Sequence, residues 1–327
     1  MRTTVIGGSG FIGRRLCEAC LRRGDEVAAL VKEPEVASEL TERGISVVTA
    51  DLSDRDAVRR ACTDADRVIN CAGALGRWST SDRELEFVNA TAPGLIVRCA
   101  ADAGARRVVH ISTAGVSGPL PDGVLADEDY PCRPVTAYQR TKLAGERIAL
   151  EQHAATGIPL TIVRPTFVYG PGDMHKFALF RSVARRRFVL VDHGTSRLHP
   201  IYVADLIDGL LTASARASGD GDIYILGGPS PQTIREMAES IARSLAVSPP
   251  GASMPKSILY LAATAAETIG RIVGREPPIT RSKVDLMSAN FAYATDRARN
   301  QLGFRPIVEP TAGMGLTVDW YRRKGLL

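Results

Sequence analysis

Residues 3–16 read TTVIGGSGFIGRRL, and this stretch decides the fold of the 327-residue chain. The run at 3–6 predicts a strand, and the residues after Phe11 predict a helix. Glycine in the turn between them allows a tight bend and lets the backbone approach a pyrophosphate, while the helix N-terminus offers N–H donors and partial positive charge. In this strand–turn–helix context we expect dinucleotide binding rather than a purely structural turn. The expected contacts are Gly7, Ser9, Gly10, Phe11, Ile12 and Gly13.

The first half of the chain alternates β-rich runs with helical stretches. The expected strands are 3–6, 27–31, 46–49, 67–70, 107–111 and 160–163, and the expected helices are 11–23, 54–62, 85–103 and 136–155. This alternation predicts a parallel sheet with helices on both faces, and right-handed crossovers then give a doubly wound α/β (Rossmann) fold.

After Pro165 the pattern becomes irregular and rich in proline and glycine, with expected strands at 199–206 and 223–226 and helices at 233–245 and 255–273. We expect a smaller, discontinuous C-terminal substrate lobe over the carboxyl edge of the sheet. The predicted division assigns 1–165 to a dinucleotide-binding and catalytic domain that also receives 199–226. It assigns 166–198 and 227–327 to the substrate-binding lobe.

Composition narrows the class of protein. With 45% hydrophobic and 24% charged residues the chain is typical of a globular protein, which excludes a disordered or fibrous one. It has no apolar run of about 18 residues and no targeting signal, so we expect a cytoplasmic protein without a membrane span. The net charge of +5 is diffuse, and Arg185–Arg187 lacks interleaved aromatics, so no nucleic-acid partner is expected. The cysteine and histidine spacing predicts no metal site.

The end of the second strand bears on cofactor preference. Val31 cannot accept a hydrogen bond there, whereas Lys32 could pair with a 2′-phosphate, which favours NADP over NAD. In the alternative, Glu33 binds the ribose and Lys32 points to solvent. At the ends of the next two strands, Asp51 and Leu52 are expected beside the adenine. Cys71, Ala72 and Gly73 are expected along the inner ribose and pyrophosphate.

Tyr138 and Lys142 form the candidate catalytic pair in the run YQRTK. Residues four apart share a helix face, so the ammonium is expected near the phenol and should lower its pKa from about 10. Tyr138 then becomes a proton donor or acceptor, and Lys142 could also hold the ribose of the nicotinamide. Upstream, Thr113 at a strand's carboxyl end could donate to the substrate oxygen. Ser112 is its rival for that role, or a cofactor contact.

Taken together, these motifs resemble the extended short-chain dehydrogenase/reductase superfamily over essentially the whole chain. They are GGSGFIG at 7–13, Ser112–Thr113, YQRTK at 138–142, RPTFVYGPGD at 164–173, HPIYVADL at 199–206 and TDRARNQLGF at 295–304. The resemblance implies a catalytic set of Thr113, Tyr138 and Lys142, with Pro165 to Val168 touching the nicotinamide. It also implies a polar position at Asn89, to which we assign no role, and a homodimer formed through the helices at 85–103 and 136–155.

Within the superfamily, the chain is most similar to the branch of 3β-hydroxysteroid dehydrogenases and dihydroflavonol reductases. Nucleotide-sugar epimerases and dehydratases usually carry an arginine at the position of Leu198, and a second one near 288–291, where this chain has no cation. We therefore expect hydride transfer at a secondary alcohol or ketone of a small, alicyclic substrate. The alternatives are a nucleotide-sugar epimerase or dehydratase with tightly bound NAD, and a non-catalytic NADP sensor.

Overall fold

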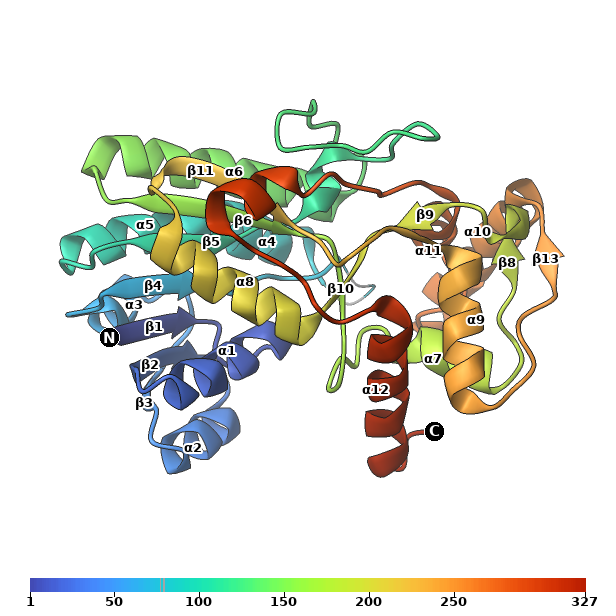
Figure 1. Ribbon diagram of the computed structural model, residues 1–327, viewed down its shortest axis with the longest axis horizontal. Helices are drawn as coiled ribbons and strands as arrows, with labels where there is room; N and C mark the ends of the chain where they lie inside the picture. Colours follow the sequence, from blue (N-terminus) through green and yellow to red (C-terminus); the bar gives the residue numbers. More distant parts are fainter. Residues whose placement is uncertain (77, 79) are drawn as a thin grey trace.

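The computed structural model describes residues 1–76, 78 and 80–327. Its centre is a seven-stranded parallel sheet in the order β11-β6-β5-β4-β1-β2-β3 (Figure 1), which confirms the doubly wound fold. The strands are β1 (Arg2–Ile6), β2 (Glu26–Val31), β3 (Ser46–Thr49), β4 (Arg67–Asn70), β5 (Val108–Ile111), β6 (Leu160–Pro165) and β11 (Asp220–Leu226). The order reverses beside β1, and in such sheets this switch point is where ligands bind.

Alternate residues of the strands face two separate cores. Val5, Ala29 and Val163 pack under α1 (Phe11–Arg22) and α8 (Val203–Arg216). Their neighbours Ile6 and Leu30 point the other way, into a second core. That core is covered by α3 (Arg55–Cys62), α5 (Ala92–Asp102) and α6 (Ala137–Thr156). Since side chains alternate across a strand, a central strand buried on both faces is rich in apolar residues, as β2 (EVAALV) is.

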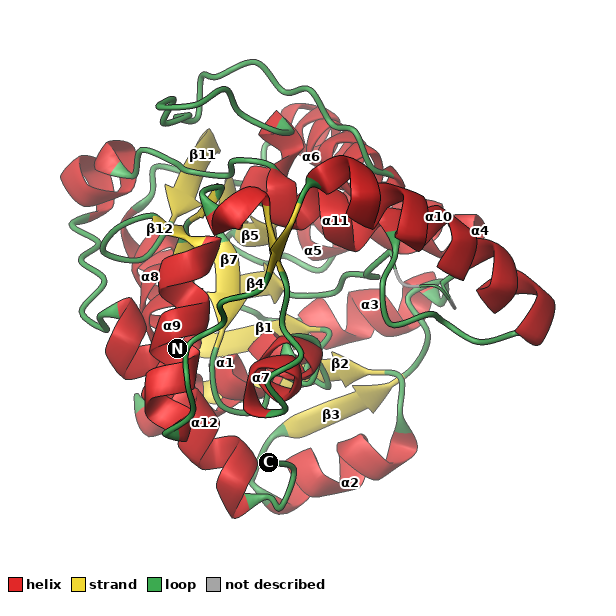
Figure 2. Cartoon of the chain, turned by 90° about the vertical axis from the view of Figure 1, so that its right-hand side faces the viewer, coloured by secondary structure: helices red, strands yellow, loops and turns green. Residues whose placement is uncertain are grey.

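The remaining elements form a lobe beside the sheet, on the right in Figure 1. Its core joins α7 (Phe177–Ala184), α9 (Ile234–Leu245) and α12 (Pro310–Arg323). An outer part contains β8 (Leu190–Val191), β13 (Ser253–Met254), α10 (Lys256–Val273) and α11 (Arg281–Ser288). Figure 2 looks onto the molecule from this side, with α7 and α12 in front of the sheet. The exact domain division stays a prediction, although all seven strands of the large sheet lie within residues 2–226.

Two expected elements are wrong in detail. The strand expected at 199–206 ends at Tyr202: β10 (Pro200–Tyr202) pairs with β7 (Phe167–Tyr169) outside the large sheet, and α8 begins at Val203. Buried Val203, Leu206, Ile207 and Leu210 have helical spacing, which outweighs the β-branched start of the run.

The helix expected at 85–103 consists of three pieces. They are α4 (Asp82–Leu85), the π-helix η1 (Glu86–Thr91) and α5. A Cβ on Gly145 of α6 would overlap the Asn89 carbonyl oxygen, so the widened turn lies where two backbones meet closely. Among the described residues, no helix has the length and apolar composition needed to cross a bilayer.

Candidate functional site

The glycine loop has the geometry of an anion cradle. Gly7 has φ +80°, and a Cβ there would lie 2.8 Å from the Ala72 nitrogen, while a Cβ on Gly13 would overlap the Gly7 carbonyl oxygen. The N-cap of α1 is Gly10, which provides no side-chain cap, and the first turn has no acidic residue. The first N–H groups of a helix have no partner within it, so this end of α1 is suited to bind a phosphate.

The part of the site where we expect the adenine of the cofactor carries an exposed ion pair. Lys32, directly after β2, lies 3.1 Å from the Asp51 carboxylate after β3, and both side chains are largely in solvent. Asp51 also accepts hydrogen bonds from the backbone and hydroxyl of Ser53, which with Lys32 hold its pKa below the usual value. A hollow of about 430 Å³ lies beside this pair, lined by Asp51, Ser53, Ser81, Arg83, Glu84 and Phe87.

Tyr138 stands in the first turn of α6, whose start is fixed by a capping box. The Thr136 hydroxyl accepts from the Gln139 backbone, and the Gln139 side chain accepts from the backbone of Thr136. Burial raises the pKa of Tyr138 to about 12, against a hydrogen bond with Thr113 that lowers it. The expected lowering of this pKa by Lys142 is therefore wrong for this structure, because burial outweighs every favourable contact of the phenol.

Lys142 is 3% exposed, and its ammonium donates to the Ile111 carbonyl oxygen at 2.6 Å. It thus reaches the end of β5, beside the loop that follows β4, where a Cβ on Gly73 would lie 3.9 Å from Nζ. Burial lowers the pKa of Lys142 to about 8, although nearby Glu146 raises it. The ammonium is consequently close to titrating at neutral pH.

The structure distinguishes the two neighbouring hydroxyls. Thr113 is half-buried, bonds with Tyr138 and accepts from the backbone of Gly115 at 3.2 Å. Ser112 is 4% exposed, and its Oγ has no hydrogen-bond partner among the described residues. Thr113 therefore joins the tyrosine, whereas the hydroxyl of Ser112 remains directed into the protein.

Asn89, whose role sequence reasoning left open, fastens the loop after β4 to α6. Its side chain accepts from the Ala74 nitrogen at 2.9 Å and donates to the Ala74 oxygen at 2.8 Å. It also donates to Thr141 at 3.3 Å, one residue before the lysine. The sequence signal for this role was a polar residue inside the helix expected at 85–103. In the structure Asn89 is fully buried, and a buried polar side chain needs hydrogen-bond partners.

Behind Lys142 lies a buried ion pair that sequence reasoning missed. Arg164 near the end of β6 donates through two nitrogens to Glu146, at 2.9 and 2.7 Å, with both side chains at most 6% exposed. Glu146 stands one turn beyond Lys142 on α6, outside the YQRTK run, and Arg164 opens a separate motif, so only the fold joins the two.

The other expected cofactor contacts lie along the same edge. Cys71, Ala72 and Gly73 follow β4 directly, with the Ala72 nitrogen donating to Asn70. Pro165 ends β6 beside Leu226, and Val168 lies in β7 opposite Ile201. Leu52 is half-buried next to Asp51. Their direct contacts with a cofactor stay predictions.

The family model that matches this chain is one of NAD-dependent epimerases and dehydratases, and its relatives include a ketoreductase and a dehydratase. A model of the NAD-dependent epimerase/dehydratase family matches residues 3–227. The chain is 29% identical over 322 residues to 4-hydroxy-2-methyl-3-oxo-4-farnesyl-3,4-dihydroquinoline-1-oxide ketoreductase of Stigmatella aurantiaca, covering 96% of this chain and 95% of that protein. It is 28% identical to dTDP-glucose 4,6-dehydratase of Streptomyces niveus, covering 98% and 93%.

A solved structure shares the fold. The UDP-glucuronic acid 4-epimerase variant from Bacillus cereus, in complex with UDP-4-deoxy-4-fluoro-glucuronic acid and NAD, superposes with a TM-score of 0.79 at 20% identity. The match covers 99% of this chain and 100% of the epimerase. The chain belongs to the NAD-dependent epimerase/dehydratase family, and it is an enzyme of the extended short-chain dehydrogenase/reductase superfamily.

Proposed function

We propose that the protein is an NAD(P)-dependent reductase or dehydrogenase that interconverts a ketone and a secondary alcohol on a small, apolar, alicyclic substrate. The observation that carries the proposal is the buried Lys142 ammonium on the Ile111 carbonyl, one helical turn from a phenol that is bonded to Thr113. These groups stand at the carboxyl edge of the sheet, which is where ligands bind in doubly wound folds.

The glycine loop fits a dinucleotide. The cradle between Gly7, Gly13 and the start of α1 would hold the pyrophosphate, and the edge formed by Cys71 to Gly73 would face the inner ribose. The Lys142 ammonium has three donors and uses one on Ile111, which leaves others for ribose hydroxyls. When bound, the nicotinamide supplies or accepts the hydride.

Tyr138 serves as the proton-transfer group. With a pKa of about 12 its phenol is protonated at neutral pH, so it is poised to donate to a substrate oxygen during reduction. Thr113 shares that oxygen and fixes the direction of the phenol. The Thr113 hydroxyl, which lowers the pKa of the phenol, then stabilises the phenolate that remains after the transfer. The same groups support oxidation at higher pH, where the phenol loses its proton more readily.

For the cofactor we propose NADP, with NAD as the alternative. Val31 ends β2 without a side-chain acceptor, and the exposed Lys32, which pairs with Asp51, would exchange that carboxylate for a ribose 2′-phosphate. An exposed ion pair of this kind contributes little stability, so the exchange costs little.

The alternative of nucleotide-sugar chemistry has one observation in its favour, the 28% identity to a dTDP-glucose dehydratase. Against it, Leu198 is 3% exposed in the lobe core and carries no charge for a diphosphate. The farnesyl quinoline oxide in the name of the Stigmatella relative fits an apolar substrate instead.

We also propose that the protein is cytoplasmic and that it forms a homodimer through η1, α5 and α6. Light scattering of the purified protein tests the dimer.

The experiment is native purification followed by mass spectrometry of any retained nucleotide, and then turnover with NADPH and a panel of alicyclic ketones. We expect release of oxidised cofactor over many turnovers, seen as loss of nicotinamide absorbance. Retained NAD with no net absorbance change, together with conversion of a nucleotide sugar, would replace this proposal by the epimerase. Cofactor binding without turnover of either substrate class would favour the sensor.

A further inference from the structure

The outer surface of the lobe exposes an apolar helix face. α10 buries Leu259 and Ala263 against β8 and α11. On its other side Leu261 is 73% exposed, Ile269 is 61% exposed and Ile272 is 82% exposed. The exposed apolar face comprises Ile258, Leu261, Ala262, Ala265, Ile269, Ile272 and Val273.

Helical geometry places this set in one sector. At about 100° per residue, all seven fall within roughly 120° of the helix circumference. The adjoining exposed sector holds Ser257, Thr264, Thr268 and Arg271. The exposed half of α10 is therefore itself amphipathic, which burial of the helix against its own lobe does not require.

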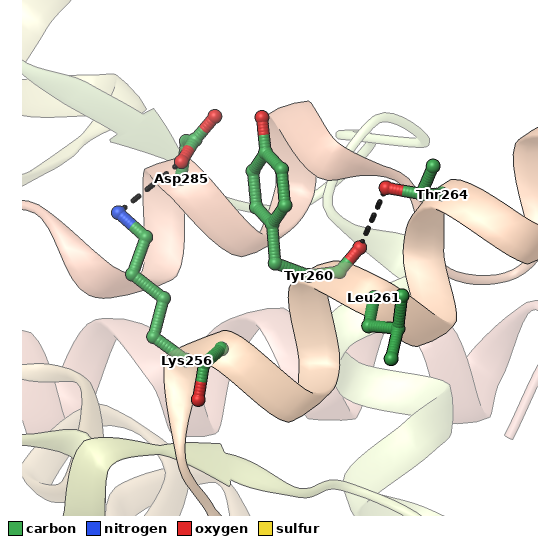
Figure 3. A pocket seen from close by; sticks show the side chains of 6 residues that line it. Lys256, Tyr260, Leu261, Thr264 and Asp285 are labelled. Carbon is green, nitrogen blue, oxygen red and sulfur yellow. Dashed lines mark hydrogen bonds and ion pairs between the residues drawn. The ribbon is translucent and has the colours of Figure 1, made fainter.

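The polar flank of α10 borders a surface hollow, and its two threonines donate to carbonyl oxygens of the same helix. A surface hollow of about 780 Å³ lies along it, lined by Lys256, Ser257, Tyr260, Leu261, Thr264 and Asp285 (Figure 3). Lys256 pairs with Asp285 at 3.3 Å across the hollow, and the Thr264 hydroxyl donates to the Tyr260 carbonyl oxygen at 2.8 Å. The apolar sector begins at Leu261, on the border of this flank.

The segment that contains α10 carries a net positive charge. Residues 256–286 contain five cationic side chains and three carboxylates. Each carboxylate is in an ion pair with a cation: Asp285 with Lys256, Glu267 with Arg281, and Glu276 with Lys283. Among the described residues, Arg271 and Arg275 have no ion-pair partner, and both stand at the C-terminal end of the apolar sector.

We propose that the apolar face of α10 docks on an anionic lipid bilayer, with the helix lying in the plane of the interface. Apolar side chains enter the acyl boundary, while Arg271 and Arg275 meet lipid phosphates. A second copy of the chain fits less well. An 18-residue helix offers a strip roughly 27 Å long and 10 Å wide, well below the roughly 800 Å² per partner of a stable interface.

The test is co-sedimentation of the full chain with phosphatidylcholine vesicles, with and without phosphatidylglycerol. We expect binding to the anionic vesicles that weakens as salt is raised. The double variant Ile269→Ser/Ile272→Ser should lose roughly tenfold or more in binding, because burial of each isoleucine is lost. The matched control is Ile307→Ser, which removes an isoleucine that is 79% exposed outside α10 and should bind as the wild type does.

A second variant tests the charge. Arg271→Gln/Arg275→Gln should bind several-fold less at low salt and show a shallower salt dependence, whereas Arg60→Gln on α3 should change neither. Circular dichroism and light scattering accompany each variant. Absence of wild-type binding to anionic vesicles would overturn the proposal. So would an isoleucine variant that binds vesicles as the wild type does but no longer self-associates, because the apolar face would then bind a second copy of the chain. Neither result bears on the chemistry proposed for Tyr138.

Discussion

Two buried arginine–carboxylate pairs lie at opposite edges of the seven-stranded sheet. At the amino edge Arg67 pairs with Asp25 and also donates to Thr3 and Ser214. At the carboxyl edge Arg164 pairs with Glu146, beside a lysine with a lowered pKa. Each side-chain nitrogen of Arg67 has a hydrogen-bond acceptor. At the carboxyl edge, Ser112 Oγ and His110 Nε2 are buried without a hydrogen-bond partner among the described residues.

The comparison indicates that the same kind of buried ion pair has a different role at each edge of the sheet. A buried pair with all its groups satisfied holds elements together, and breaking it exposes an uncompensated charge. A buried pair beside an ionisable lysine also sets the electrostatic potential at that lysine. The carboxyl edge should therefore control chemistry, and the amino edge stability.

The largest effect should come from Tyr138→Phe. Loss of the proton-transfer group should lower kcat about a thousandfold, roughly 4 kcal/mol, with the urea midpoint unchanged. Steady-state turnover with NADPH and cofactor titration measure this. If Tyr138→Phe retains the wild-type kcat for the identified substrate, the phenol is not the acid. The assignment of the chemistry to the carboxyl edge would then be wrong for Tyr138.

At the other edge, Asp25→Ala should cost about 3 kcal/mol of unfolding free energy, because Arg67 would remain buried without its partner. The kcat/KM of the folded enzyme should not change. The control Asp208→Ala breaks an exposed pair with Arg23 and should cost less than about 1 kcal/mol. Equal costs for the two variants would contradict the distinction drawn from burial.

Lys142→Met should lower kcat by less than Tyr138→Phe does and should still stabilise the protein at pH 7, by about 1 kcal/mol. The folded pKa of about 8 lies below the usual 10.5, so the folded state carries the cost of a buried charge at low pH. Between these values the unfolded state binds more protons, and wild-type stability rises with pH. The advantage of methionine, reduced by the bond lost to Ile111, should therefore shrink from pH 7 to pH 9.5 in urea unfolding.

Glu146→Gln should shift the pH profile of kcat for the reduction. Since Glu146 raises the pKa of Lys142, its loss should lower that pKa, and the alkaline limb of the reductive kcat profile should shift down by roughly half a unit to one unit. Asp25→Asn, its counterpart at the amino edge, should leave the limb in place. A common shift in both variants would mean that general loosening, and not the local field, controls the lysine.

These differences also mark what the sequence could predict. The glycine loop and the Tyr138–Lys142 spacing are local patterns, so they predicted a strand–turn–helix unit and a shared helix face. The acceptor of Lys142 lies 31 residues upstream, and Glu146 meets Arg164 from another element. The direction of the tyrosine pKa depends on burial by the whole fold. For that reason spacing alone gave the wrong direction.

The smallest effect on stability should come from a third kind of ion pair, the exposed Lys32–Asp51 contact. In solvent such a pair contributes little to stability, so Lys32→Ala should leave the urea midpoint unchanged. If Lys32 exchanges Asp51 for a 2′-phosphate, however, kcat/KM for NADPH should fall about tenfold, roughly 1.4 kcal/mol, while that for NADH stays the same. Lys324→Ala, which removes an exposed lysine near the C-terminus, should change neither ratio. An unchanged NADPH/NADH ratio in Lys32→Ala would leave Glu33 as the ribose contact and favour NAD. In that case the exposed pair would be a surface contact with no part in cofactor choice.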